Sequence, residues 1–190
     1  MAVFRNSSST LARLAVISLP VLAVAGGAAL LSRRHPVGNH RVMEPLRPVS
    51  LQDYLGRWYE VARYEQSFEK GCEACSADYS LRADGKISVV NSCRTASGKQ
   101  RTVRGTAKLV PNSHGAKLKV SFFGPLYLGN YWVLDHAEDY GWSIVGDPTG
   151  RYLWLLSRTP TPSDTEMRAL INRAAALGYD TTQLVMTQQP

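Results

Sequence analysis

The sequence has few of the residues that build metal and redox sites. It contains only three cysteines, Cys72, Cys75 and Cys93, and four histidines in 190 residues. The motif CEAC at 72–75 has the spacing of a redox or zinc site, but no second CxxC accompanies it. A thioredoxin-type motif also needs a helix amino terminus to lower the pKa of its thiol, whereas this one precedes an expected strand. We therefore expect neither a metal centre nor a thiol redox centre.

Motifs for hydrolysis and phosphate binding are missing as well. No serine lies in a nucleophile-elbow setting, and there is no glycine-rich phosphate loop. Asp135 and His136 are neighbours, but adjacent residues of a strand point to opposite faces and cannot easily work as a catalytic pair. We expect a protein that is not an enzyme and uses no cofactor.

Strong positive charge is missing from most of the chain. Six of the 22 lysines and arginines, but only one of the 15 acidic residues, precede residue 51, so residues 51–190 carry +2 of the formal +7. No basic stripe with interleaved aromatic residues follows. This distribution argues against a nucleic-acid partner.

One long apolar run is present at residues 14–31, LAVISLPVLAVAGGAALL, eighteen residues without a charge and with arginines on both sides. The run approaches the length of a membrane span, and it also contains a small-x-small cleavage pattern at 23–25. We expect residues 1–31 to be either a cleaved signal peptide or an uncleaved transmembrane anchor. Both alternatives direct the protein to the cell envelope.

Between this run and the rest of the chain, residues 32–49 contain three prolines and show no periodicity, which is typical of a linker. No cysteine follows the apolar run directly, so a bacterial lipid anchor has no acceptor there. The remaining residues, 50–190, are expected to form one globular domain.

Short runs with period-two alternation recur between turn signals from residue 57 onward. Sequential short hairpins form an up-and-down sheet, and eight strands are enough for such a sheet to close around one small ligand. The expected fold class is mainly β, an eight-stranded antiparallel barrel. We expect its strands at 57–66, 74–82, 86–93, 100–110, 116–123, 130–136, 140–146 and 151–158.

After the strands the period changes to that of a helix. Ser163 and Glu166 form a capping box, an apolar stripe follows, and Gly178 stands where the helix should stop. The stripe predicts one amphipathic helix packed on the outside of the barrel. A short last strand at 182–187 would then return to the sheet.

The cysteines are expected to form one disulfide and leave one free thiol, because export leads to an oxidising compartment. A hairpin turn with Gly85 in the left-handed conformation sets the register of its two strands so that Cys75 faces Cys93. This register predicts a Cys75–Cys93 disulfide, with Cys72 as a competitor for Cys93.

The stretch YLGRWYEVARY, residues 54–64, places Gly56 and Trp58 at the start of the first strand. A ligand-binding barrel needs one closed end, and Trp58 is the largest side chain available to close it. Gly56 permits a tight turn beneath the indole, and Arg158, where the last barrel strand ends, is placed to lie on the indole face.

This constellation resembles the lipocalin family over essentially all of residues 50–190. Its ordered motifs are similar to the bacterial and apolipoprotein-D-like branch: WYEVARY, SFEKG, YSLRADGKISVVN, KVSFFGP, DYGWSIVGDP, YLWLLSRTP and a final QQP. The resemblance implies an exported lipid-carrier barrel in which Gly56, Trp58 and Arg158 form the closed-end signature. The chain departs from the pattern at 136–138, where the aspartate of the second family motif is absent unless Asp135 or Asp139 replaces it. The lipid-modified cysteine usual in bacterial members is also absent.

The family's strand alignment, carried onto this sequence, implies a set of residues that line the cavity. Asn91, Tyr79 and Tyr131 are candidates to hydrogen-bond a carboxylate or phosphate head group. The lining residues are Ala77, Tyr79, Val89, Val103, Val120, Phe122, Tyr131 and Trp154.

The resulting hypothesis is a carrier of the cell envelope, facing the periplasm, that binds fatty acids, lysophospholipids or similar small hydrophobic ligands. It would contact the membrane through its amino-terminal segment, and its oligomeric state, a homodimer included, is left open. Two alternatives remain. One is a lipid- or pigment-modifying enzyme that uses Glu60, inward-facing by parity with Trp58, as its acid or base. The other is a structural envelope protein with a filled core.

Overall fold

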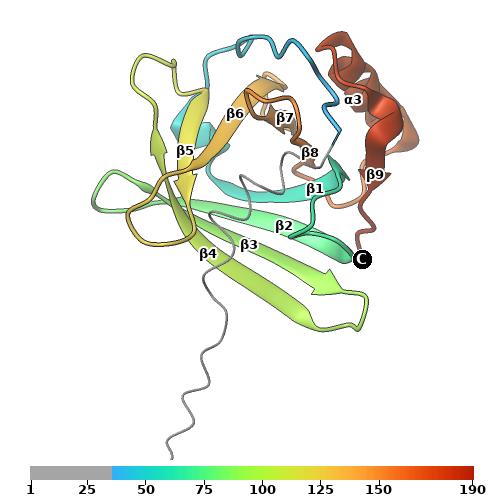
Figure 1. The fold of residues 1–190 in the computed structure, drawn as a ribbon, viewed down its shortest axis with the longest axis horizontal. Coiled ribbons are helices and arrows are strands. Elements are labelled where there is room, and N and C mark those ends of the chain that lie inside the picture. The colour runs from blue at the N-terminus through green and yellow to red at the C-terminus, as the bar shows by residue number, and fades with distance from the viewer. Residues whose placement is uncertain (1–35) are drawn as a thin grey trace, which may run out of the picture.

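The computed structural model describes residues 36–190 as a closed β-barrel with one long helix outside it (Figure 1). Each strand pairs antiparallel with the next, and β1 pairs with both β2 and β8, which closes the barrel. The expected fold class is confirmed. The strands are β1 (Gly56–Tyr64), β2 (Cys72–Leu81), β3 (Ile87–Thr95), β4 (Gln100–Leu109), β5 (Lys117–Ser121), β6 (Gly129–His136), β7 (Trp142–Gly146) and β8 (Leu153–Ser157), with a short β9 (Leu184–Met186) that pairs with β1.

The expected signal peptide or anchor, residues 1–31, lies outside the described residues. Within residues 36–190, no helix combines the length and the apolar character needed to cross a bilayer.

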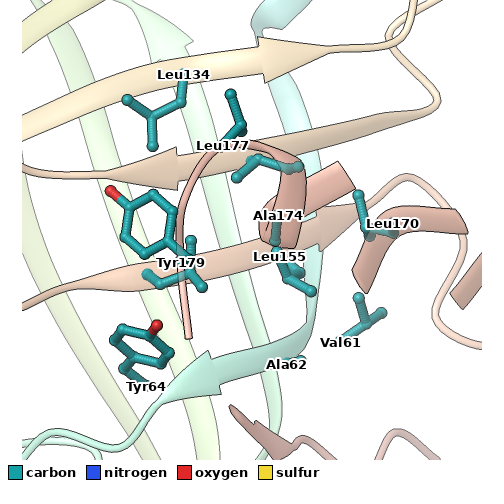
Figure 2. Close-up of a cluster of buried hydrophobic side chains, with 11 residues drawn as sticks. Val61, Ala62, Tyr64, Leu134, Leu155, Leu170, Ala174, Leu177 and Tyr179 are labelled. Atoms are coloured by element: carbon teal, nitrogen blue, oxygen red, sulfur yellow. The ribbon is translucent and has the colours of Figure 1, made fainter. Parts of the chain in front are cut away.

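Helix α3 (Asp164–Ala176) covers one side of the barrel, as its apolar stripe predicted (Figure 2). The expected capping box is present, because the Ser163 side chain accepts from the Glu166 amide and the Glu166 side chain accepts from the Ser163 amide. Ala174 is fully buried in an apolar cluster that joins the helix to outward-facing residues of β1, β6, β7 and β8. This cluster explains why β8 is apolar on both faces, since its outer face is covered by α3.

Residues 36–49, which we call the strap, follow the outside of the barrel and were expected to form part of a linker. The amides of Gly38 and Asn39 donate to the Gly150 carbonyl at 3.0 and 3.2 Å, and the Val49 amide donates to the His114 carbonyl at 2.9 Å. A Cβ on Gly150 would lie 1.8 Å from the Asn39 carbonyl oxygen, so only glycine allows this approach. Backbone hydrogen bonds hold both ends of the strap, and the Asn39 side chain adds a hydrogen bond to the Leu177 carbonyl at 3.0 Å. It leads into a short helix, α2 (Leu51–Tyr54), and a 3₁₀ turn, η2 (Thr181–Gln183), precedes β9.

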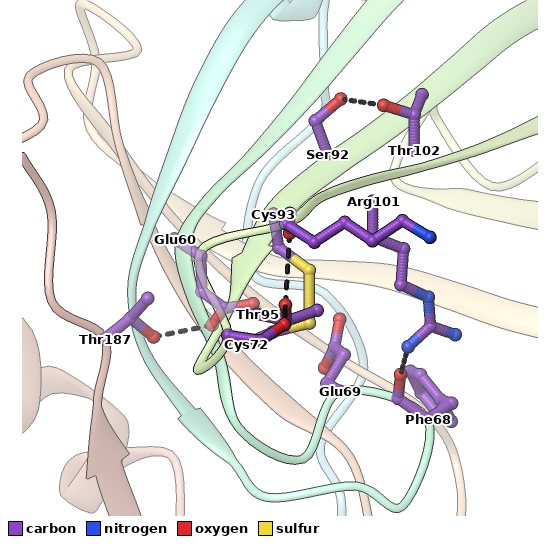
Figure 3. The surroundings of a disulfide bond; sticks show 12 residues. Glu60, Phe68, Glu69, Cys72, Ser92, Cys93, Thr95, Arg101, Thr102 and Thr187 are labelled. Carbon is purple, nitrogen blue, oxygen red and sulfur yellow. Dashed lines mark hydrogen bonds between the residues drawn. A yellow bond between two sulfur atoms is a disulfide. The ribbon is translucent and has the colours of Figure 1, made fainter.

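A bulge in β2 overturns the predicted disulfide. The register is regular up to Ser76 opposite Ser92, but the next pair is Glu73 with Arg94, so two residues of β2 face the single Cys93. Cys93 is bonded to Cys72 instead, with the Cα atoms 5.6 Å apart (Figure 3). Cys75 is buried and free. The Cys75–Cys93 prediction was therefore wrong, because it extended a regular ladder through this bulge.

A second bulge lies in β1, between Glu60 and Ala62. Without it, residues 58, 60, 62 and 64 would share one face. The extra residue brings Arg63 to the same face as Glu60, three residues earlier in the chain, and the two side chains form an ion pair.

Candidate ligand-binding site inside the barrel

The closed end of the barrel is built around Trp58, whose side chain is 0% exposed. The Arg158 guanidinium carbon lies 3.8 Å from the centre of the indole, which is the expected stacking contact. The same guanidinium donates to the backbone carbonyls of Arg57 and Asp53, both at 2.7 Å, and of Leu55 at 2.9 Å. Gly56, with φ +93°, makes the turn that brings these carbonyls around Arg158.

The two aspartates that could replace the missing family aspartate have different surroundings. Asp135 is 1% exposed and forms ion pairs with Arg173 of α3 and Arg47 of the strap, so it joins both segments to β6. Asp139 accepts from the Gly141 amide at 2.9 Å within the β6–β7 turn. Neither aspartate contacts the Trp58–Arg158 pair through a hydrogen bond within residues 36–190.

Above Trp58, a chain of hydroxyl groups crosses the interior. The Tyr79 hydroxyl donates to that of Tyr131 at 3.1 Å, Tyr131 is 2.9 Å from the Tyr54 hydroxyl, and Tyr54 is 3.0 Å from Ser143 Oγ. Tyr79 and Tyr131, two of the residues expected to bind a head group, are therefore hydrogen-bonded to each other. Burial raises the pKa of Tyr54 to about 12.

A row of inward-facing residues on neighbouring strands leads from the closed end towards the opposite, open end. Ala77 pairs with Trp58, Asn91 pairs with Ala77, and Val103 pairs with Asn91. The face that carries Trp58 therefore passes through three more strands. Of the nine residues expected to line a site, Val89 is buried, whereas the others are half-buried or more exposed: Ala77, Tyr79, Asn91, Val103, Val120, Phe122, Tyr131 and Trp154.

This partial exposure matters because side chains inside a filled barrel would be buried. Val103 is 36% and Phe122 is 37% exposed. The Oδ1 atom of Asn91 is buried without a hydrogen-bond partner in the described part of the chain. Two hollows of about 310 and 550 Å³ lie elsewhere, against the strap, and include none of the expected lining residues.

Towards the open end, a polar cluster lies on the inner side of β1. Glu60 Oε1 accepts from Arg63 Nη1 at 2.8 Å and from Thr187 Oγ1 at 2.6 Å (Figure 3 shows the Thr187 bond). Burial raises the pKa of Glu60, and the hydrogen bonds from Thr187 and Arg63 oppose that shift. Glu60, the residue we considered as a catalytic acid, is 5% exposed and already carries these two partners.

Glu69 completes this cluster from the β1–β2 loop. Its Oε2 atom accepts from Trp154 Nε1 at 3.1 Å, while its backbone carbonyl accepts from Arg63 Nη2 at 3.2 Å. Burial, and then the nearby charge of Glu60, raise the pKa of Glu69 to about 8. At neutral pH its carboxyl group therefore retains a proton and can donate a hydrogen bond into the interior.

Sequence reasoning missed Arg63 and Glu69. Arg63 is brought inward by the β1 bulge, which strand alternation does not reveal. Glu69 lies in a loop, where no periodicity indicates direction; its place two residues before the glycine of SFEKG is the only signal.

Comparison with known proteins agrees with this architecture. A family model described as a lipocalin-like domain matches residues 49–189. The outer membrane lipoprotein Blc of Vibrio cholerae is 43% identical over 155 residues, which cover 80% of this chain and 90% of that protein. Blc of Escherichia coli K12 is 37% identical over 173 residues, covering 90% and 97% of the two chains.

More distant proteins are similar as well. Apolipoprotein D of Mus musculus is 33% identical over 147 residues, covering 73% of this chain and 76% of that protein. The structure of insecticyanin from the tobacco hornworm Manduca sexta superposes with a TM-score of 0.65 at 19% identity, covering 82% of this chain and 88% of that one. The chain belongs to the lipocalin family, in the branch that includes bacterial Blc and apolipoprotein D.

Proposed function

We propose that this lipocalin is a lipid carrier of the cell envelope that holds a fatty acid or lysophospholipid with its acyl chain inside the barrel. The observation that carries this proposal is the partial exposure of inward-facing apolar residues, Val103 and Phe122 above all. Their exposed apolar surface gains free energy when an acyl chain replaces water.

Binding is driven by burial of the acyl chain. At about 0.8 kcal/mol per buried CH₂ group, ten methylenes contribute roughly 8 kcal/mol before the cost of ordering the ligand. The polar head would remain near the open end. There the protonated carboxyl group of Glu69 donates to a carboxylate or phosphate oxygen, and the unpartnered Oδ1 of Asn91 accepts from a ligand hydroxyl group.

The location in the envelope is supported by the amino-terminal apolar run together with the relatives, which are named outer membrane lipoproteins. In this proposal residues 1–31 act as a signal peptide or anchor, and residues 50–190 bind the ligand in the periplasm. We favour a carrier over a lipid-modifying enzyme because Glu60 is occupied by Arg63 and Thr187.

A pair of neighbouring substitutions on β4 tests the proposal. Val103→Trp fills the interior, whereas Thr102→Trp adds the same side chain on the outer face of the same strand. With a fluorescent fatty acid as probe and the full chain as receptor, we expect Val103→Trp to weaken binding more than tenfold and Thr102→Trp to leave it unchanged.

Native mass spectrometry of the protein purified from its own cells provides a second measurement, in which a co-purified lipid is expected. Absence of fatty acid binding in the unaltered protein, or equal effects of the two substitutions, would contradict the carrier proposal.

A further inference from the structure

Half of the large apolar residues that the described chain exposes lie around one end of the barrel. This open end, opposite Trp58, is formed by the loops at 65–71, 96–99, 122–128 and 147–152. The loop FFGPLYL at 122–128 alone exposes Phe122 at 37%, Phe123 at 41%, Leu126 at 60% and Leu128 at 61%. Phe68 and Val103 are exposed at the same end. Apolar groups gathered in this way indicate an interaction surface.

The exposed charged residues around the open end are mainly cations. Four exposed cations surround it: Lys70, Arg94, Lys99 and Arg101. Within residues 36–190 none of the four forms an ion pair with a carboxylate. Of the carboxylates nearby, Glu65 is close to Arg63, Glu73 accepts from the Gln188 amide and Asp147 accepts from Thr149, while burial raises the pKa of Glu69 to about 8. Apolar side chains beside unpaired cations are the composition that binds an anionic lipid surface.

The strap starts at this same end. Gly38 and Asn39 are hydrogen-bonded to Gly150 in the β7–β8 loop, and the strap then runs towards the closed end, where Val49 meets the β4–β5 loop. In the sequence, only residues 32–35 separate the apolar run from the first described residue, Pro36. Four extended residues span at most about 14 Å. An uncleaved anchor would therefore hold the open end, and not the closed end, next to the bilayer.

We propose that the open end of the barrel docks on an anionic lipid bilayer, with the 122–128 loop inserted among the head groups and the surrounding cations against lipid phosphates. The docked barrel then presents its mouth to the membrane, so a lipid can pass between bilayer and barrel with little exposure to water. Phe123, Leu126 and Leu128 are not among the residues proposed to contact the acyl chain, so docking of their loop can be tested without a bound ligand.

The test is a fluorescent label on the full-length protein mixed with vesicles of phosphatidylglycerol and phosphatidylcholine. An environment-sensitive dye is attached to Leu126→Cys at the open end or to Leu81→Cys, which is 54% exposed at the other end and serves as the matched control. Unsubstituted protein treated with the dye gives the background from buried Cys75.

We expect a blue shift at position 126 and quenching of that label by brominated acyl chains, with neither effect at position 81. Vesicles of phosphatidylcholine alone should reduce the shift. Lys99→Gln should lower the ratio of docked to undocked protein about fivefold, because one cation near an anionic surface contributes about 1 kcal/mol.

A response at both positions, at neither, or only at position 81 would overturn the proposal. Binding of the fluorescent fatty acid by the Leu126→Cys protein is measured in parallel, so that failure to dock and failure to bind ligand are distinguished.

Discussion

Replacement of Glu69 by glutamine should stabilise the protein at alkaline pH and leave its stability nearly unchanged in acid. The pKa of Glu69 is about 8 in the folded barrel, whereas a glutamate in an unfolded chain has a pKa of about 4.3. Between these values the folded protein holds a proton that the unfolded chain has lost. The free energy of unfolding therefore falls as pH rises through this window, and Glu69→Gln removes that loss.

The size of the effect follows from the same two values. Each pH unit between them corresponds to about 1.4 kcal/mol, which gives an upper limit of about 5 kcal/mol at pH 8 and above. Glu69 keeps some contact with water in the barrel, and its hydrogen bond from Trp154 stabilises the ionised form, so we expect about 2 kcal/mol.

Urea unfolding of the full chain, followed by tryptophan fluorescence at pH 5 and pH 9, measures this difference. Glu65→Gln, an exposed residue of the same loop, is the matched control and should show the same difference from the unaltered protein at both pH values. A Glu69→Gln protein whose advantage does not grow between pH 5 and pH 9 would refute the reasoning.

Three further outcomes are expected. Arg158→Ala should lower the free energy of unfolding by about 3 kcal/mol, because three charge-assisted hydrogen bonds and the indole contact are lost. Arg158→Lys should lower it by about half as much. Urea unfolding measures both, and a loss below 1 kcal/mol for Arg158→Ala would contradict this role. Cys72→Ser should lower the free energy of unfolding by about 3 kcal/mol, because the disulfide joins residues separated by 21 positions. Peptide mapping of the non-reduced, unaltered protein should find Cys75 as the free thiol, and a disulfide-linked Cys75–Cys93 peptide would refute the assignment. Gly150→Ala should release the strap near Asn39, seen as faster amide hydrogen exchange at residues 38–39, and unchanged exchange there would show that the backbone accommodates the Cβ.

The architecture could be predicted from the sequence because its signals are local. Period-two alternation and short turns locate the eight strands, and the Ser163–Glu166 capping box marks the start of α3 to within one residue. The contact between Trp58 and Arg158 could be anticipated because Trp58 lies near the start of β1 and Arg158 directly follows β8.

The errors come from features that no local pattern reveals. One extra residue at Ala74, with φ +51°, is enough to exchange Cys75 for Cys72 as the partner of Cys93. The β1 bulge likewise brings Arg63 to the inside. The strap contacts the barrel through backbone hydrogen bonds at Gly38, Asn39 and Val49 and through the Arg47–Asp135 ion pair, and no sequence period reveals either kind of contact.

The short pairing between β1 and β2 affects the order in which parts of the chain can join the folded barrel. These strands are paired only from Gly56 to Tyr59, and beyond that point residues 187–189 bond to both of them, through Glu60 on one side and Ala74 and Cys75 on the other. A chain synthesised only as far as α3 has every barrel strand but an open wall beside the Glu60–Arg63 pair. Completion of the barrel thus requires a segment synthesised more than a hundred residues after the strands it joins, and a fusion partner placed close behind residue 189 would compete with that last step.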